Sequence, residues 1–419
     1  MLALPTVSIT APVAEAREGG SPAVIHLRRV GGNRTKPLTV ALSWSGSAKA
    51  RDLLGESARV TFPARAKTID IRIGATFDRV GEAAETAKVS LVPSRFYRVD
   101  KALAGAAFRV VDPPRVEGKL SWRSAATAPL GRVEPETVVV GDRMYAFSGY
   151  TDDRWQPIRR VDRFDPVTNK WTRLRDMPIG ITHAGVAVVG TKVWFAGGYA
   201  ERVGTRANQD IAITTVKIYD TLTDTWADGP ALPQQRGSGG MGLIGNTLYF
   251  TSGERRDRLS VSETWALDLS NTAAGWKPRA AIPEARTHFG TVVLNDQLYV
   301  MGGQQGVDVS AKMLASAFRY DPRADEWTRL ANLPIAMSHY SPNTVVRNDK
   351  IYMLGGEQSF NVESTQVLEY DPATDEYRTL TPLPTARASG MAGVINGQFI
   401  FSGGKNNGWN GDTYIGTFG

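Results

Sequence analysis

The chain has 419 residues, of which 42% are apolar and 22% are charged, and it contains no cysteine. This composition excludes disulfides, thiolate metal sites and cysteine nucleophiles, and no apolar run approaches the roughly 20 residues of a membrane-spanning helix. Residues 1–113 carry 17 basic and 10 acidic side chains, so the net charge of +7 lies there and the remainder is neutral. A neutral remainder without a basic stripe argues against binding to nucleic acid.

A chain of 419 residues is longer than a single hydrophobic core usually supports, so two domains are predicted. The first, residues 1–113, is predicted to be a β-sandwich. The first ten residues lack a basic and an apolar segment, so a signal peptide is expected to be absent or already removed. Seven stretches of alternating apolar and polar residues follow one another between turns: Val7–Thr10, Ala23–Arg29, Leu38–Trp44, Arg59–Phe62, Thr68–Ile73, Thr86–Val92 and Ala107–Val111. Such a series is typical of an immunoglobulin-like sandwich.

Three features of this part resemble the Calx-β family: Glu18-Gly19, the run Val60-Thr-Phe-Pro-Ala, and the spaced acids that end at Glu85 before Val89-Ser-Leu. In the calcium-binding members, acidic residues cluster at one end of the sandwich, where Ca²⁺ finds its oxygen ligands. The resemblance implies a calcium site at Glu18, Asp52, Asp78, Glu82, Glu85 and Asp112. An acidic run of the family is here reduced to Asp-Pro-Pro, so a domain that has lost its calcium is the other open interpretation.

A repeat of about 50 residues occupies the rest of the chain, after a short linker at Pro113-Pro114. Three markers recur in a constant order. Apolar runs end in a glycine at Gly149, Gly198, Gly253, Gly303, Gly356 and Gly404; an aromatic residue stands at Trp122, Trp171, Trp226, Trp276, Trp327 and Tyr377; and a proline follows at Pro129, Pro178, Pro233, Pro283, Pro334 and Pro384. These markers indicate repeated four-stranded sheets that bury their faces against one another.

The repeat resembles the kelch family, most clearly in the segments Tyr320–Trp327 and Tyr370–Tyr377. The resemblance covers about residues 118–419 and implies a six-bladed β-propeller over residues 114–419. The first aromatic marker precedes the first glycine marker, and only one short strand follows the last glycine. Residues Lys119–Ala125 are therefore predicted to pair beside Thr413–Phe418 and to close the ring, which removes its open edges. In the third repeat, an insertion at 270–274 is expected to make the outer turn bulge.

The variable loops and the segments that lead into each innermost strand are predicted to lie at one end of the propeller. This end is expected to bind ligands, because it gathers aromatic residues, arginines and three of the four histidines. The candidate ligand-binding residues are Arg132, Tyr150, Trp155, His183, Tyr199, Arg202, Arg206, Arg236, Arg286, His288, His339, Tyr340, Arg387 and Trp409. The arginines either anchor an acidic ligand, as they do in kelch adaptors, or hydrogen-bond to neighbouring loop carbonyls. The aromatic residues either contact a ligand or hold their own loops.

His183, His288 and His339 share one offset in the second, fourth and fifth repeats. Three imidazoles suit zinc or copper. In a wide ring, however, histidines two blades apart are not expected to reach one ion, so the sequence does not favour a transition-metal site.

Two kelch enzymes bear on catalysis. The copper radical of galactose oxidase needs a cysteine, so this chain cannot have that activity. N-acetylneuraminate epimerase opens a sugar ring with a glutamate and an arginine, and the residues that could act similarly are Glu254, Glu357, Arg236, Arg286 and Arg387. No complete catalytic set is identifiable. The sequence therefore favours a non-catalytic extracellular or cell-surface recognition or adhesion protein that binds a glycan or a protein, with a sugar-active enzyme as the alternative.

Overall fold

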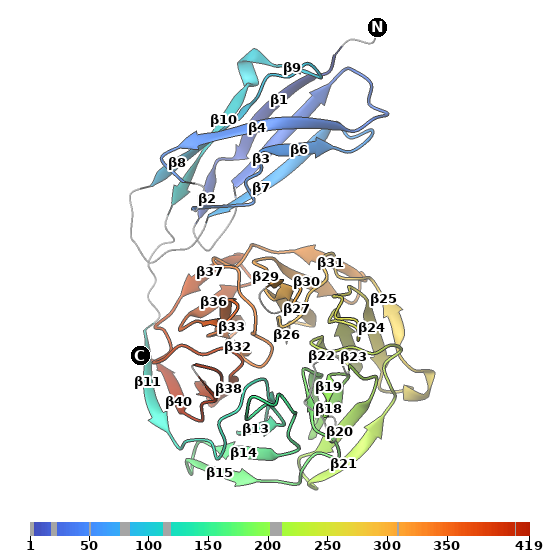
Figure 1. Ribbon diagram of the computed structural model, residues 1–419, viewed down its shortest axis with the longest axis vertical. Helices are drawn as coiled ribbons and strands as arrows, with labels where there is room; N and C mark the ends of the chain where they lie inside the picture. Colours follow the sequence, from blue (N-terminus) through green and yellow to red (C-terminus); the bar gives the residue numbers. More distant parts are fainter. Residues whose placement is uncertain are drawn as a thin grey trace. The chain divides into compact units, whose positions relative to one another are not determined.

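The structure is a computed structural model that describes residues 4–17, 23–49, 52–75, 84–111, 119–201, 212–307, 310–406 and 408–419 (Figure 1). These residues divide into two compact units, which consist mainly of the residues before and after position 117. The helices in the described ranges are two short 3-10 turns, η2 (Lys101–Leu103) and η3 (Thr272–Ala274). Neither these turns nor any other described helix has the length and apolarity to span a bilayer.

The N-terminal unit contains two five-stranded sheets. The first has the order β5 (Leu53–Leu54), β7 (Thr68–Ala75), β3 (Ala23–Val30), β1 (Thr6–Val13) and β9 (Arg98–Val99). The second has the order β2 (Glu15–Arg17), β10 (Gly105–Val111), β8 (Glu85–Leu91), β4 (Leu38–Gly46) and β6 (Arg59–Phe62). All seven predicted strands are present, and alternate side chains such as Ile25, Leu27, Val40 and Phe108 form one core.

The predicted calcium ligands fall largely outside the described residues, which include neither Glu18, Asp78, Glu82 nor Asp112. Of the other two, Asp52 accepts a hydrogen bond from the backbone amide of Lys49 at 2.6 Å, and Glu85 begins β8. The calcium site therefore stays a prediction, and so does the assignment to the Calx-β family.

The second unit contains six four-stranded antiparallel sheets, here called blades and numbered along the chain. Blades 1 to 3 are β12 (Glu136–Val140), β13 (Arg143–Phe147), β14 (Val161–Asp165) and β15 (Lys170–Arg173); β17 (Gly185–Val189), β18 (Lys192–Ala196), β20 (Val216–Asp220) and β21 (Thr225–Gly229); and β22 (Gly240–Ile244), β23 (Thr247–Thr251), β24 (Thr264–Asp268) and β25 (Lys277–Arg279). Blades 4 and 5 are β26 (Gly290–Leu294), β27 (Gln297–Met301), β30 (Ala317–Asp321) and β31 (Glu326–Arg329); and β32 (Thr344–Arg347), β33 (Lys350–Leu354), β36 (Val367–Asp371) and β37 (Glu376–Thr379).

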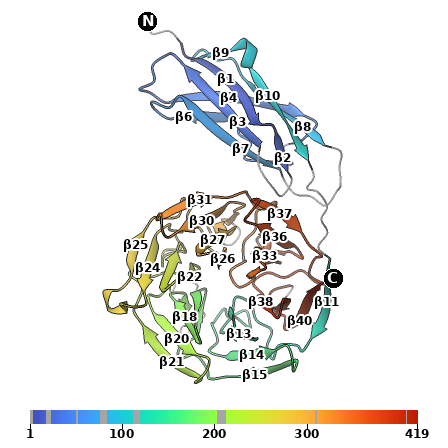
Figure 2. The same cartoon turned by 180° about the vertical axis from the view of Figure 1, so that it is seen from behind.

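Blade 6 is formed by β38 (Met391–Ile395), β39 (Gln398–Ser402), β40 (Thr413–Phe418) and β11 (Leu120–Ala125), so it draws its outer strand from the start of the unit. Strands β11 and β40 pair antiparallel from Leu120 opposite Phe418 to Ala125 opposite Thr413, which confirms the predicted pairing. The innermost strands of successive blades contact one another, and β38 contacts β12, so the blades surround a central axis (Figures 1 and 2). The result is a closed kelch-type β-propeller.

Three short two-stranded sheets extend blades 2, 4 and 5 at the end of their second strands. They comprise β16 (Ile181–Thr182) with β19 (Tyr199–Ala200), β28 (Gln304–Gln305) with β29 (Lys312–Met313), and β34 (Glu357–Ser359) with β35 (Val362–Glu363). In blade 3, the predicted bulge is the 3-10 turn η3, which lies between β24 and β25. These short sheets and the segments that lead into the innermost strands lie at the same end of the antiparallel blades. This end carries the candidate site.

Candidate functional site at the mouth of the channel

One backbone position recurs just before the innermost strand of every blade and brings six side chains to the channel. These residues, here called the axial ring, have φ between 53° and 59°: Glu134, His183, Ser238, His288, His339 and Ser389. A residue in the left-handed conformation turns the chain sharply. Beside this turn, the backbone of the loop that follows the second strand passes close to the lead-in segment. Gly303 has φ 102° beside Thr287, and a side chain there would begin 2.7 Å from the Thr287 carbonyl oxygen. The ring is therefore fixed by backbone geometry that the repeat supplies in each blade.

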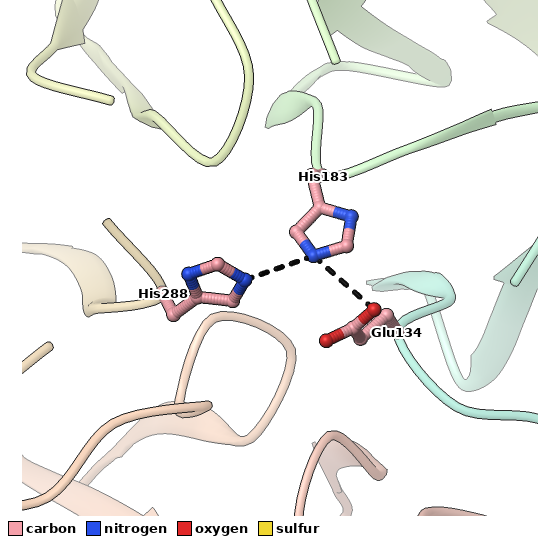
Figure 3. A group of neighbouring side chains, drawn as sticks. All are labelled: Glu134, His183 and His288. Atoms are coloured by element: carbon pink, nitrogen blue, oxygen red, sulfur yellow. Dashed lines mark hydrogen bonds and ion pairs between the residues drawn. The ribbon is translucent and has the colours of Figure 1, made fainter. Parts of the chain in front are cut away.

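Three members of the axial ring meet at one point, as Figure 3 shows. Nε2 of His183 lies 3.1 Å from Nε2 of His288 and 3.2 Å from Oε2 of Glu134. One ligand atom from each of the three residues falls within 4.8 Å of the others. The expectation that histidines two blades apart would not reach one ion is wrong, because the left-handed positions direct these side chains inward, where the channel is narrow.

His339 connects this group to a second carboxylate. Its Nε2 lies 3.4 Å from Oε1 of Glu134, and its Nδ1 lies 2.7 Å from Oε2 of Glu357. The ring of His339 also packs on that of His288, with centroids 4.5 Å apart. One connected group of side chains thus joins blades 1, 2, 4 and 5. Its members are Glu134, His183, His288, His339 and Glu357.

Burial and mutual charge shift the pKa values of this group in opposite directions. Burial lowers the pKa of His339, but the carboxylates of Glu134 and Glu357 raise it more, to about 9. Burial, helped by the two other histidines, holds the pKa of His288 well below its usual value. Burial would raise the pKa of Glu134, yet His183 and His339 bring it well below its usual value. Near neutral pH, His339 is therefore charged, His288 is neutral and Glu134 is ionised.

A third buried carboxyl group, that of Glu136, lies next to the axial ring. Burial raises the pKa of Glu136 to about 8, although its Oε1 accepts a hydrogen bond from the amide of Ala184 at 2.6 Å. Glu136 begins β12 and is 7% exposed. This side chain joins blade 1 to blade 2 and is mostly protonated at neutral pH.

Above the axial ring is a cavity of about 580 Å³. Glu134, His288, His339 and Glu357 line it together with Trp155, Arg258, Gln304, Met313, Phe360 and Lys405, which come from five blades. Its wall thus combines two carboxylates, two histidines, two further cationic side chains and large apolar groups. A pocket of this size accommodates a small molecule or a few residues of a peptide.

The four predicted arginines do not line this cavity. Arg132, Arg236, Arg286 and Arg387 are each at most 2% exposed, and each donates to loop carbonyl oxygens. Arg286, for example, donates to the carbonyls of Gly302 and Ser316 at 2.8 and 2.7 Å. Their carboxylate partners are Asp162, Glu263, Glu284 and Asp412. Of the two interpretations, the structure therefore supports the one in which these four arginines organise the loops, because none of their four guanidinium groups is accessible to an acidic ligand.

The predicted aromatic residues divide into two groups. Tyr150, Tyr199 and Tyr340 are at most 1% exposed. Tyr150 and Tyr199 hydrogen-bond to Thr182 and Glu254 of the next blade, and Tyr340 contacts Met337 of its own segment. Trp155 and Trp409 are only partly buried, and their rings lie 6.0 Å apart. The predicted residues Arg202 and Arg206 lie outside the described residues. Trp155 is therefore the predicted aromatic residue that a ligand in the cavity would contact.

The two glutamates of the enzymatic alternative also occupy different surroundings. Glu254 is 1% exposed, accepts a hydrogen bond from Tyr199 and pairs with Nε of Arg258 at 3.0 Å. Glu357 lines the cavity and contacts His339. Arg236, Arg286 and Arg387 pair instead with Glu263, Glu284 and Asp412. The predicted combinations of glutamate and arginine are thus not the ones that the fold brings together.

Sequence reasoning missed Glu134 and Arg258. A signal for Glu134 was present, because it stands two residues after Arg132, as Ser238, His288 and Ser389 stand two residues after Arg236, Arg286 and Arg387. Glu134 is therefore the first-blade equivalent of the histidines. Arg258 lies in a variable loop, where the repeat gives no register.

The family model that matches this chain covers the part that contains the repeat. The KLHDC2/KLHL20/DRC7 kelch-repeats domain matches residues 118–303 and 215–404. The chain is 25% identical over 311 residues to kelch repeat-containing protein At3g27220 of Arabidopsis thaliana, covering 68% of this chain and 71% of that protein. It is 27% identical over 263 residues to human kelch-like protein 23, covering 62% of this chain and 43% of that protein. The solved structure titled "Structure of YjhT" superposes with a TM-score of 0.58 at 14% identity, covering 70% of this chain and 95% of that one.

Proposed function

Because the chain belongs to the kelch-repeat family, whose members are typically protein-binding, we propose that its propeller is a recognition module. The ligand, a segment of a protein or a glycan, occupies the cavity at the mouth of the channel. One observation carries this proposal: five blades together line about 580 Å³ of space with charged and apolar side chains. Such a mixture supplies both the apolar area and the oriented polar groups that recognition needs.

Two apolar side chains give the first test of this proposal. Trp155 and Phe360 line the cavity, and Phe360 is 43% exposed although it is large and apolar. Replacing Trp155 by Ala and Phe360 by Ser should abolish binding of any genuine ligand found by glycan array and pull-down. The matched control replaces Val167 and Leu222 by Ser, because these are 73% and 81% exposed in the turns at the opposite end of blades 1 and 2.

The two variants separate specific from adventitious binding. A ligand that the control protein retains and the cavity variant loses supports the proposal, provided that both proteins melt like the wild type. A ligand that both variants retain, measured by titration calorimetry, would place recognition elsewhere and overturn it.

A sugar-active enzyme is the second candidate, and the ion pair between Glu254 and Arg258, of which Arg258 lines the cavity, is the observation that favours it. Exchange between the anomers of sialic acid, followed by NMR, distinguishes the two functions. We expect no acceleration by the protein. Acceleration that disappears in Glu254→Gln or Glu357→Gln would replace recognition by catalysis.

The resemblance of residues 1–113 to Calx-β domains supports the further proposal that the protein acts outside the cell and binds calcium. Asp52 and Glu85 are the two described members of the suggested ligand set. About 1 mM Ca²⁺, in the range of extracellular calcium modules, should raise the melting temperature of the full chain. The double variant Asp52→Asn, Glu85→Gln should lose this increase, and an unchanged wild-type melting temperature would refute calcium binding.

A further inference from the structure

The axial ring contains a group of side chains whose lone pairs face one another. Oγ1 of Thr182 donates to Oη of Tyr150 at 2.9 Å, so this oxygen accepts from Nδ1 of His183 at 3.1 Å. His183 then carries its ring proton on Nδ1, and its Nε2 presents a lone pair to the channel.

The same arrangement recurs in blade 4. Oγ1 of Thr287 donates to the carbonyl of Gln304 at 3.4 Å and accepts from Nδ1 of His288 at 3.0 Å. Nε2 of His288 therefore also presents a lone pair, only 3.1 Å from that of His183. Both threonines are completely buried, which fixes these hydrogen bonds and the orientation of both rings.

A carboxylate completes the group. Oε2 of Glu134 is buried and lies 3.2 Å from Nε2 of His183. Two imidazole lone pairs and a carboxylate oxygen at such distances repel one another unless a cation lies between them. The arrangement is therefore complementary to a positive charge at the centre of the three atoms.

The spacing selects the kind of cation. Tetrahedral Zn²⁺, with bonds of about 2.0 Å, places its ligand atoms about 3.3 Å apart. Two of the separations here, 3.1 and 3.2 Å from Nε2 of His183, are close to this value, and all three ligand atoms lie within 4.8 Å of one another. Two neutral imidazoles and one carboxylate also form a common zinc ligand set with three protein ligands and one open position. Ca²⁺ and Mg²⁺ prefer oxygen ligands and would not use the imidazoles.

We propose that Glu134, His183 and His288 form a zinc-binding site on the axis of the propeller, with its fourth coordination position directed to the cavity. Glu134 and His288 line that cavity, so a water molecule or an oxygen of the recognised ligand can complete the coordination. Thr182 and Thr287 orient the two imidazoles, as outer hydrogen-bond partners of metal ligands do. His339, 3.4 Å from Oε1 of Glu134, positions the carboxylate from the other side.

Titration calorimetry of the full chain with ZnCl₂, after removal of metals by a chelator, tests the site. We expect one equivalent of Zn²⁺ to bind. His183→Gln and His288→Gln should each weaken this binding at least about 100-fold, because removal of a ligand exceeds the 10–100-fold effect of an outer partner. His26→Gln is the matched control, since His26 lies in the N-terminal unit beside Asp70 and is the fourth histidine of the chain.

Two further measurements keep the test valid if a histidine variant fails to fold. Ser238→Ala changes a non-ligand at the same offset and should bind zinc like the wild type. Nitrogen-detected NMR of the wild type, with only four histidines to resolve, should show Nε2 shifts at His183 and His288 on zinc addition and none at His26. The proposal is overturned if the wild type binds no stoichiometric zinc, if the His183→Gln, His288→Gln double variant binds it equally well, or if the shifts occur at His26 instead.

Discussion

Arg286 shows how a repeat position that looks ready for ligand binding can instead stabilise the blade. Its guanidinium is completely buried, donates to the carbonyls of Gly302, Ser316 and Glu284 and to Oγ of Ser316, and pairs with the Glu284 carboxylate. The apolar Ile181 and Met337 stand at the same offset in blades 2 and 5. The offset therefore faces the inside of the blade, where a cation is tolerated only when all its donors are used.

Replacing Arg286 by Met should destabilise the propeller by about 3 kcal/mol, because the carbonyls of Gly302 and Ser316 lose a charged donor inside the protein. Denaturant unfolding measures this loss. The control is Arg323→Ala, which removes an exposed ion pair with Asp296 at 3.4 Å and should cost less than about 1 kcal/mol. Equal unfolding midpoints for the two variants would show that Arg286 is not a structural residue.

The sequence allowed a partial prediction of the site. The common offset of His183, His288 and His339 was readable from the repeat, and so was their location at the mouth of the channel. Their convergence was not readable, because it depends on φ near 55° at each position and on the width of the channel. Neither quantity follows from residue spacing. Glu134 was missed because its blade has a carboxylate where the others have imidazole.

In blades 1, 4 and 5, a pair of contacts at the turn before the outer strand joins the blade to its neighbour. In blade 4, Trp327 Nε1 donates to the carbonyl of Ala280, and Asp325 accepts from the amide of the same residue, both at 2.9 Å. Asp325 also accepts from Oη of Tyr320 at 2.6 Å. Asn169 accepts from the amide of Ala126 in the same way. The nearly constant spacing of the aromatic markers along the chain therefore places these contacts at corresponding positions in the blades that have them.

The contact at Asp325 makes a small part of the stability depend on pH. The hydrogen bond from Tyr320 holds the pKa of Asp325 below its usual value. The stabilisation is therefore present above the unfolded-state pKa near 3.9 and is lost as the pH falls through the lower folded-state value. Asp325→Asn keeps a side-chain oxygen that can accept the amide hydrogen bond, as Asn169 does in blade 1. The substitution should lower the melting temperature by only about 1 °C at pH 7, because the carboxylate is exposed and its charge is screened by solvent.

Thermal melting across pH checks this prediction. The difference between wild type and Asp325→Asn should begin to shrink as the pH falls below about 3.9 and should disappear only below the lower folded-state pKa, because the unfolded state is protonated first. A difference that stays constant from pH 7 to pH 3 would mean that the charge of Asp325 plays no part.

At the level of strands, the sequence was highly informative because turn chemistry and hydrophobic alternation repeat together. The turns between the two innermost strands of the six blades all begin with a residue of positive φ, which is Gly141, Gly190, Gly245, Asn295, Asn348 or Asn396. The short hairpins such as β34 with β35 were not predicted, because they belong to variable loops whose pairing depends on tertiary contacts.

The whole ring depends on one pairing between distant parts of the chain. Leu120 of β11 is buried against Tyr352, Leu380 and Phe399 of the last two blades, and Trp122 packs beside it. The ring of Trp122 also covers Gly416, where a side chain would begin 2.6 Å from the indole. Strand β11 therefore supplies both an edge partner and apolar area to blade 6.

Deleting residues 120–125 should destabilise the propeller by about 5 kcal/mol or more, because it exposes the edge of β40 and the apolar surface under Leu120 and Trp122. Calorimetric melting of the full chain and the deletion measures the effect. An unchanged melting transition would mean that the ring does not need β11, whereas a lower transition with increased aggregation is the expected result.

The same pairing fixes the order of events during synthesis. About 290 residues separate β11 from β40, and closing so long a loop carries an entropic cost before the contact stabilises anything. On the ribosome, β11 leaves the exit tunnel early and then waits while five blades are made. Until Thr413–Phe418 emerges, its apolar side chains and unpaired edge stay open to proteases and to other nascent chains. Synthesis of β40, the last strand of the propeller, therefore ends the period in which β11 stays exposed.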